Sequence, residues 1–76
     1  MERIYFAQWA FDKNGKWVAR NMFYKIYIPY GNHDQEADRI RDHVRDQFGD
    51  VHFDYLLPVE RPTENMRESA EAVRAY

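Results

Sequence analysis

The sequence contains no cysteine, and this absence excludes disulfide bonds and thiolate metal sites. No apolar run is long enough to cross a bilayer, and the start MERIYFAQ lacks the ordered regions of a signal peptide. A cytoplasmic protein without membrane contact is therefore expected. With 76 residues the chain has room for a single domain, 1–76, and its ends, 1–2 and 75–76, are expected to fray.

The chain also lacks the basic excess of a typical nucleic-acid module, because its formal net charge is −2. The only serine is Ser69, and no glycine-rich phosphate loop is present. The three histidines, His33, His43 and His52, do not have the spacing of a metal site. His52 and Asp54 fall on the same side of one expected strand and are interpreted as polar surface residues. These absences predict a protein that is not an enzyme and that carries no metal or cofactor.

Residues 3–29 hold eight of the thirteen aromatic residues and are expected to form one long β-hairpin. The segment Asp12-Lys13-Asn14-Gly15-Lys16 is typical of a type I turn followed by a bulge in which glycine has a positive φ. This turn predicts the pairs Phe11 with Trp17, Trp9 with Ala19, and Tyr5 with Phe23.

The predicted register divides the hairpin into two apolar faces. The aliphatic face, expected to pack against a helix, carries Ile4, Phe6, Ala10, Val18, Met22, Tyr24, Ile26 and Ile28. The aromatic face carries Tyr5, Ala7, Trp9, Phe11, Trp17, Ala19, Phe23 and Tyr27. A sheet with one solvated face should alternate apolar and polar residues along each strand, so part of the aromatic face needs a cover.

Helix and strand signals follow the hairpin. Asn32 is a typical N-cap with Gln35 three residues later, and the helix is expected to end at Phe48 before Gly49. Its apolar stripe is Ala37, Ile40, Val44 and Phe48. Residues 51–57 predict a third strand, with Val51, Phe53, Tyr55 and Leu57 on one side. We expect it antiparallel beside the first strand, and a place directly beside the second strand is the alternative. Thr63 caps a last helix whose stripe is Met66, Ala70, Val73 and Tyr76.

These elements predict an α+β fold in two layers, with the element order ββαβα. A three-stranded, mostly antiparallel sheet carries one main helix on one face, and a short C-terminal helix completes the domain. A domain of this size buries only about 60% of the surface of its unfolded chain. Contact with a partner or a second copy would therefore add needed stability.

The aromatic face is the first candidate site, because aromatic and arginine side chains are favoured anchors of protein interfaces. Its predicted partner-binding residues are Trp9, Phe11, Trp17, Phe23, Tyr27, Arg20 and Lys25. Two alternatives stay open. The face can be covered by the terminal helix or by a second copy in a homodimer, or it can stack bases of a single-stranded nucleic acid.

An acidic row on the main helix is the second candidate site. Its residues repeat every four positions and are Asp34, Asp38, Asp42 and Asp46. Such a row is either a solvated helix face or a surface that docks on a basic groove of a partner. Arg41 and Arg45 follow Asp38 and Asp42 by three residues and are expected to offset the repulsion.

Together these features predict a small non-enzymatic module that binds a larger protein or protein complex as a stoichiometric inhibitor or adaptor. Accessory proteins of phages and mobile elements, anti-CRISPR inhibitors among them, share this general character, which is an analogy of class only. The partner complex can itself be one that binds nucleic acid. Direct binding of single-stranded nucleic acid by the sheet is the first alternative, and a structural homodimer is the second.

Overall fold

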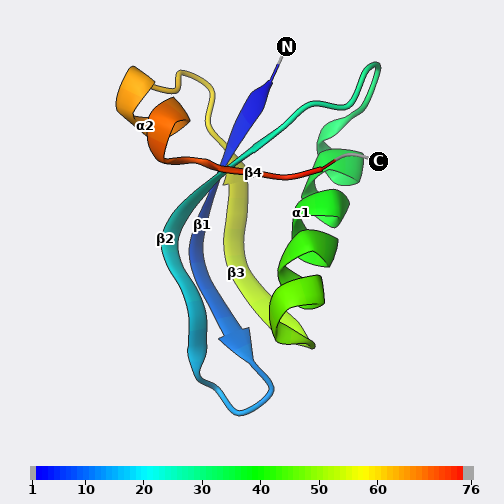
Figure 1. Ribbon diagram of the computed structural model, residues 1–76, viewed down its shortest axis with the longest axis vertical. Coiled ribbons are helices and arrows are strands. Elements are labelled where there is room, and N and C mark those ends of the chain that lie inside the picture. Colours follow the sequence, from blue (N-terminus) through cyan, green and yellow to red (C-terminus); the bar gives the residue numbers. More distant parts are fainter. Residues whose placement is uncertain (1, 75–76) are drawn as a thin grey trace.

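The computed structural model describes residues 2–74, and within this range four strands form one mixed sheet in the order β3-β1-β2-β4. The strands are β1 (Arg3–Asp12), β2 (Trp17–Ile26), β3 (Val51–Pro58) and β4 (Glu71–Ala72). The helices are α1 (His33–Phe48) and α2 (Glu64–Ser69). Figure 1 shows α1 along one side of the strands and α2 on the other side, near one end of the sheet. The expected fraying of residues 1, 75 and 76 lies outside the described residues.

The turn between β1 and β2 confirms the predicted type. The Gly15 amide donates to the Asp12 carbonyl at 3.0 Å, and the Asp12 amide donates to the Lys16 carbonyl at 2.9 Å. The Asp12 side chain accepts from the amides of Asn14 and Lys16. Gly15 has a φ of 78°, which a glycine adopts without steric cost.

The predicted register holds only next to this turn. Phe11 pairs with Trp17 as expected, but the next pair is Ala10 with Ala19, so Val18 is an extra residue on β2. Beyond this β-bulge, Trp9 pairs with Arg20 rather than with Ala19, and Tyr5 pairs with Tyr24 rather than with Phe23. A bulge inserts one residue into one strand, which shifts every later pair by one position.

A second irregularity crosses the three long strands at Gln8. Gln8 is not paired with a residue of β2 or β3, and the residues opposite it on those strands, Asn21 and Tyr55, have positive φ values of 50° and 62°. At this level, the alternation of core-facing side chains along each strand shifts by one residue. On β1 they are Tyr5 and Ala7 on one side of Gln8 and Ala10 on the other. The same change occurs between Met22 and Ala19 and between Leu56 and Phe53.

The predicted division of the faces was therefore wrong in half of the hairpin. Tyr5, Ala7 and Ala19 were assigned to the aromatic face but are buried in the core, whereas Phe6 lies on the opposite face beside Phe23. In β3 the predicted alternation ends at Tyr55, and Tyr55 and Leu57 are exposed. The physical reason is the bulge and the positive φ residues, which rotate the strands relative to a regular alternation.

Helix α1 begins and ends where predicted. Asn32 and Gln35 form a reciprocal capping box, and Gly49 follows the last residue with its amide bonded to the Arg45 carbonyl. Ile40 and Val44 are fully buried against the sheet, which confirms the centre of the predicted stripe. The prediction that Phe48 belongs to the buried stripe was wrong, because 49% of Phe48 is exposed. The stripe instead includes the buried Glu36, one helical turn before Ile40.

The third strand lies antiparallel beside β1, as predicted. The C-terminal helix is shorter than predicted: Thr63 caps it, but it ends at Ser69. Glu71 and Ala72 then form β4, parallel to β2, so the sheet has four strands and not three. The free edge of β2 accepts this pairing, and Val73 is buried in the main core. Tyr76, the last residue of the predicted stripe, lies outside the described residues.

Candidate functional site

The face of the sheet opposite α1 carries three rows of side chains, here called the outer sheet face. Directly paired residues of antiparallel strands project on the same side, so each row joins one residue from β3, one from β1 and one from β2. The rows are His52-Phe11-Trp17, Asp54-Trp9-Arg20 and Leu57-Phe6-Phe23, with Trp17 aligned through the bulge.

The aromatic side chains of the outer sheet face form an ordered cluster. The rings of Trp9 and Trp17 stack with centroids 5.2 Å apart, and Phe6 and Phe23 are 5.1 Å apart. Trp17 is 47% exposed and Leu57 is 55% exposed, whereas the other apolar members are half-buried. The face therefore carries two groups of packed aromatic rings that are partly in contact with solvent, as surfaces that bind a partner often are.

Arg20 is the cation of this surface and stands at its β2 side. Its guanidinium carbon lies 4.4 Å from the centroid of Trp17 and 5.5 Å from that of Trp9, within the range of a cation–π interaction. Within residues 2–74, Arg20 forms no ion pair. Stacking fixes the plane of the guanidinium and leaves its N–H groups accessible to a carboxylate.

His52 and Asp54 lie on the β3 side of the same face. The His52 Nε2 atom is 2.9 Å from the Asp54 Oδ1 atom, and both side chains are exposed to solvent. The outer sheet face contains no serine, threonine or lysine that this pair could activate. The contact leaves the Asp54 Oδ2 atom available and orients the carboxylate.

Two predicted members of the aromatic site lie elsewhere. Lys25 pairs with Ile4 and Ala72, beyond the third row. Ile4 is buried, and the segment from Pro58 to Arg67 lies beside it, so this end of the face is closed. Tyr27 follows β2 and lines a hollow together with Arg3 and Tyr30. The outer sheet face therefore brings together Trp9, Phe11, Trp17, Arg20 and Phe23, but not Lys25 or Tyr27.

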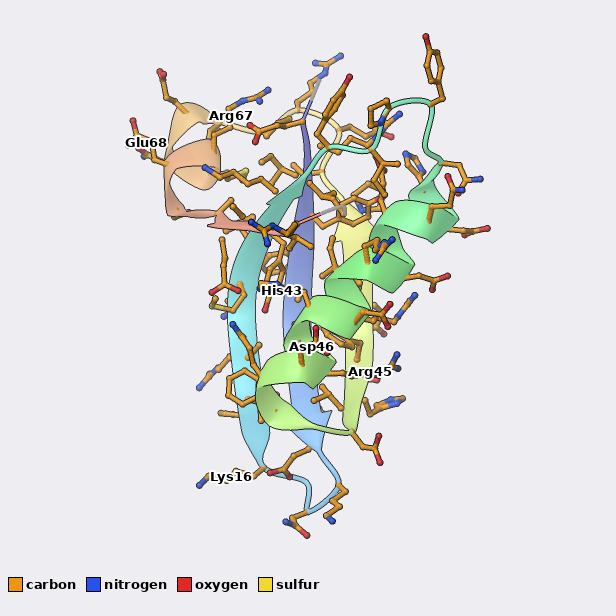
Figure 2. The ribbon with its side chains drawn as sticks, turned by 45° about the vertical axis from the view of Figure 1, so that its right-hand side comes forward. Lys16, His43, Arg45, Asp46, Arg67 and Glu68 are labelled. Atoms are coloured by element: carbon orange, nitrogen blue, oxygen red, sulfur yellow. The ribbon has the colours of Figure 1, made fainter. Side chains whose placement is uncertain are left out.

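The acidic row of α1 is exposed along its whole length. Asp38 pairs with Arg41 at 3.1 Å, and Asp42 contacts Arg45 at 3.9 Å, as expected from their spacing. Figure 2 shows Arg45 and Asp46 together on the last turns of the helix. The arginines offset half of the row, so its electrostatic field is weaker than four aspartates alone would produce.

A buried carboxylate, which the sequence did not single out, lies between α1 and β1. Glu36 accepts a hydrogen bond from the Tyr5 hydroxyl at 2.8 Å and from the Arg3 Nε atom at 3.1 Å. Burial, and then the bond to Glu36, raise the pKa of Tyr5 well above its ordinary value. Glu36 lies four residues before Ile40, so both project from the same face of α1. This spacing is the only sequence signal that Glu36 points toward the sheet.

A second polar contact joins α1 to β4. The His43 Nε2 atom is 2.5 Å from the Glu71 Oε2 atom, and the His43 ring meets Tyr24 edge to face. Burial raises the pKa of Tyr24 to about 12, and the charge of Glu71 adds to the shift. Figure 2 shows His43 on the side of α1 that is turned toward the strands. The Tyr5–Glu36 bond is buried and the His43–Glu71 contact is partly exposed, and both join α1 to the sheet.

Comparison with protein-family models, curated proteins and solved structures finds no match. Within the described range, no helix is long and apolar enough to cross a membrane, and no cluster of three His, Asp or Glu residues has metal-binding geometry. The fold and site define a small α+β domain with an exposed, ordered aromatic sheet face.

Proposed function

We propose that this protein is a non-enzymatic protein-binding module that acts through its outer sheet face, in the manner of a stoichiometric inhibitor or adaptor. One observation carries the proposal: three rows of paired side chains combine a stacked tryptophan pair with an unpaired, stacked arginine. Tryptophan and arginine dominate the binding energy of protein interfaces, because they bury a large area and lose little conformational freedom.

The composition of the outer sheet face favours a protein partner over other ligands. The centre of the face is apolar, and charged groups lie at its two sides, on β2 and β3. This arrangement matches the apolar core and polar rim of protein interfaces. Within residues 2–74, the hollows around Tyr27, Val59, Ala37 and Lys13 share only His52 with the three rows, so a flat contact fits this face better than a small molecule does.

Affinity capture with matched variants tests the proposed function. The protein is immobilised and exposed to an extract of its native host, and retained proteins are measured by mass spectrometry. Wild type and the α1 control Arg45→Ala are expected to retain the same proteins, and Trp17→Ala with Arg20→Ala is expected to lose them. Equal retention by all three proteins, with circular dichroism unchanged, would exclude the outer sheet face.

Binding of single-stranded nucleic acid is the alternative, and the stacked Trp9 and Trp17 rings favour it, because bases stack on such rings. The face offers one cation, Arg20, and also the carboxylate of Asp54, which repels phosphate. An oligothymidine titration at increasing salt separates the two functions. Tight binding that weakens steeply with salt and disappears in Arg20→Ala would favour nucleic acid over protein.

A further inference from the structure

The charges of the outer sheet face are self-complementary. In the middle row, Arg20 stands on β2 and Asp54 stands on β3, with Trp9 between them on the central strand. The row therefore places a cation and an anion at equal steps on either side of β1. Arg20 has no ion pair within residues 2–74, and Asp54 has one oxygen free of its contact with His52.

We propose that the protein bound by the outer sheet face is a second copy of this chain, stacked face to face. The inference rests on the proposed function, since it names the partner of that same site. A twofold axis parallel to β1 and midway between the two sheets places β2 of one copy over β3 of the other. Arg20 then faces Asp54 of the second copy, and Asp54 faces its Arg20. Such an interface is isologous, because each contact occurs twice.

The same axis also matches the other two rows. Trp17 lies over His52 of the second copy, Phe23 lies over its Leu57, and Phe11 and Phe6 meet their own equivalents. Exposed Leu57 and Trp17 are both covered in this arrangement. Two stacked sheets lie about 10 Å apart with their strands near parallel, which is the spacing that interdigitating side chains of this size fill.

The alternative twofold axis, perpendicular to the strands, is electrostatically unfavourable. It places β2 over β2 and β3 over β3, so Arg20 faces its own equivalent and Asp54 faces another Asp54. Like charges that meet in an interface oppose association strongly. The charge pattern therefore selects one orientation of the second copy.

The proposed dimer has a defined exterior. Because α1 covers the opposite side of the sheet, the two copies of α1 lie on the two outer surfaces of a four-layer assembly (Figure 1). The acidic rows of both helices remain exposed and available to a larger partner. Segment 58–67 closes the face at Ile4, so the contact is confined to the three rows.

Charge reversal tests the second copy and its orientation together. Sedimentation equilibrium over a wide concentration series measures the dimerisation constant of the wild type, Arg20→Glu, Asp54→Arg and the double reversal. Each single reversal places like charges opposite each other and is expected to weaken the dimer by more than about tenfold. The double reversal restores opposite charges and is expected to recover dimerisation. Arg45→Glu on α1 is the matched control and should dimerise as the wild type does.

Two results overturn the inference. A wild type that is monomeric throughout the series excludes the second copy, while capture of a host protein lost with Trp17→Ala would leave the proposed function intact. A dimer that the single reversals do not weaken, or that the double reversal does not recover, excludes the stacked arrangement. A different result would contradict the proposed function itself: the wild type is a monomer, and variants of the outer sheet face retain every protein that the wild type binds.

Discussion

Two buried tyrosines make the stability of the fold sensitive to alkaline pH. Burial raises the pKa of Tyr24 to about 12, whereas an unfolded tyrosine has a pKa of about 10. A group whose pKa is raised on folding stabilises the protein below its unfolded pKa, and this contribution is lost as the pH rises through the folded value. The free energy of unfolding is therefore expected to fall between about pH 10 and pH 12.

Urea denaturation at several alkaline pH values measures this fall. Tyr24→Phe removes one ionising phenol, so the variant should lose less stability than the wild type between neutral and alkaline pH. Tyr30→Phe is the matched control, because Tyr30 is fully exposed. An identical pH dependence in Tyr24→Phe and the wild type would contradict the burial of this hydroxyl.

The Tyr5–Glu36 hydrogen bond is a second residue-scale test. Glu36→Leu leaves the buried Tyr5 hydroxyl with only the His33 carbonyl, at 3.4 Å, as an acceptor, and this loss is expected to cost about 1–3 kcal/mol. Adding Tyr5→Phe removes the weakly bonded hydroxyl and should recover part of that loss. Denaturation of both single variants and the double variant forms a double-mutant cycle. Additive losses would show that the two groups do not interact.

At the scale of the elements, a strained residue in β3 offers a substitution that is expected to increase the stability of the fold. Tyr55 has a φ of 62°, which is costly for a side chain with a Cβ atom, and it is 65% exposed. Tyr55→Gly removes the strain and little packing, so it is expected to stabilise the protein by about 1 kcal/mol. Tyr55→Ala keeps the Cβ atom and should show no such gain. Thermal denaturation distinguishes these results.

Signals that act over a few residues predicted the elements well. Asp12 and Gly15 specified the turn, Asn32 with Gln35 and Gly49 specified both ends of α1, and Thr63 capped α2. Each of these signals is a local hydrogen bond or a local backbone preference, and the residues themselves carry it. The direction of the third strand followed from the helical crossover, whereas its place beside β1 was the preferred one of two arrangements that the sequence left open.

Signals that depend on pairing between strands were not available from the sequence. The bulge at Val18 and the irregularity at Gln8 decide which side chains enter the core, and strict alternation missed both. Gln8, a polar residue inside an apolar run, and Asn21, which tolerates a positive φ, were the visible signs. Tyr55 gave none. Five of the seven residues predicted for the aromatic site are nevertheless on the outer sheet face: Trp9, Phe11, Trp17 and Arg20 lie on the turn side of Gln8, and Phe23 lies beyond it.

For the whole molecule, stability rests on the α1 side of the sheet, and the proposed binding lies on the other side. Ile40 is fully buried, so Ile40→Ala is expected to cost about 2–5 kcal/mol and to unfold much of a marginally stable domain. Trp17→Ala removes an exposed ring and should cost no more than about 1.5 kcal/mol, the size of an aromatic pair interaction. Chemical denaturation of both variants compares the two losses. Equal losses would place Trp17 in the core.

The central claim is that the outer sheet face binds protein, and site-specific photo-crosslinking at its exposed edge tests it most directly. A photoreactive phenylalanine replaces Leu57, which is exposed in the third row, and in a control it replaces the exposed Gln47 on α1. After irradiation under native conditions, position 57 is predicted to give a discrete protein adduct, at twice the chain mass if the partner is a second copy. An adduct at position 47 and none at position 57 would contradict the account.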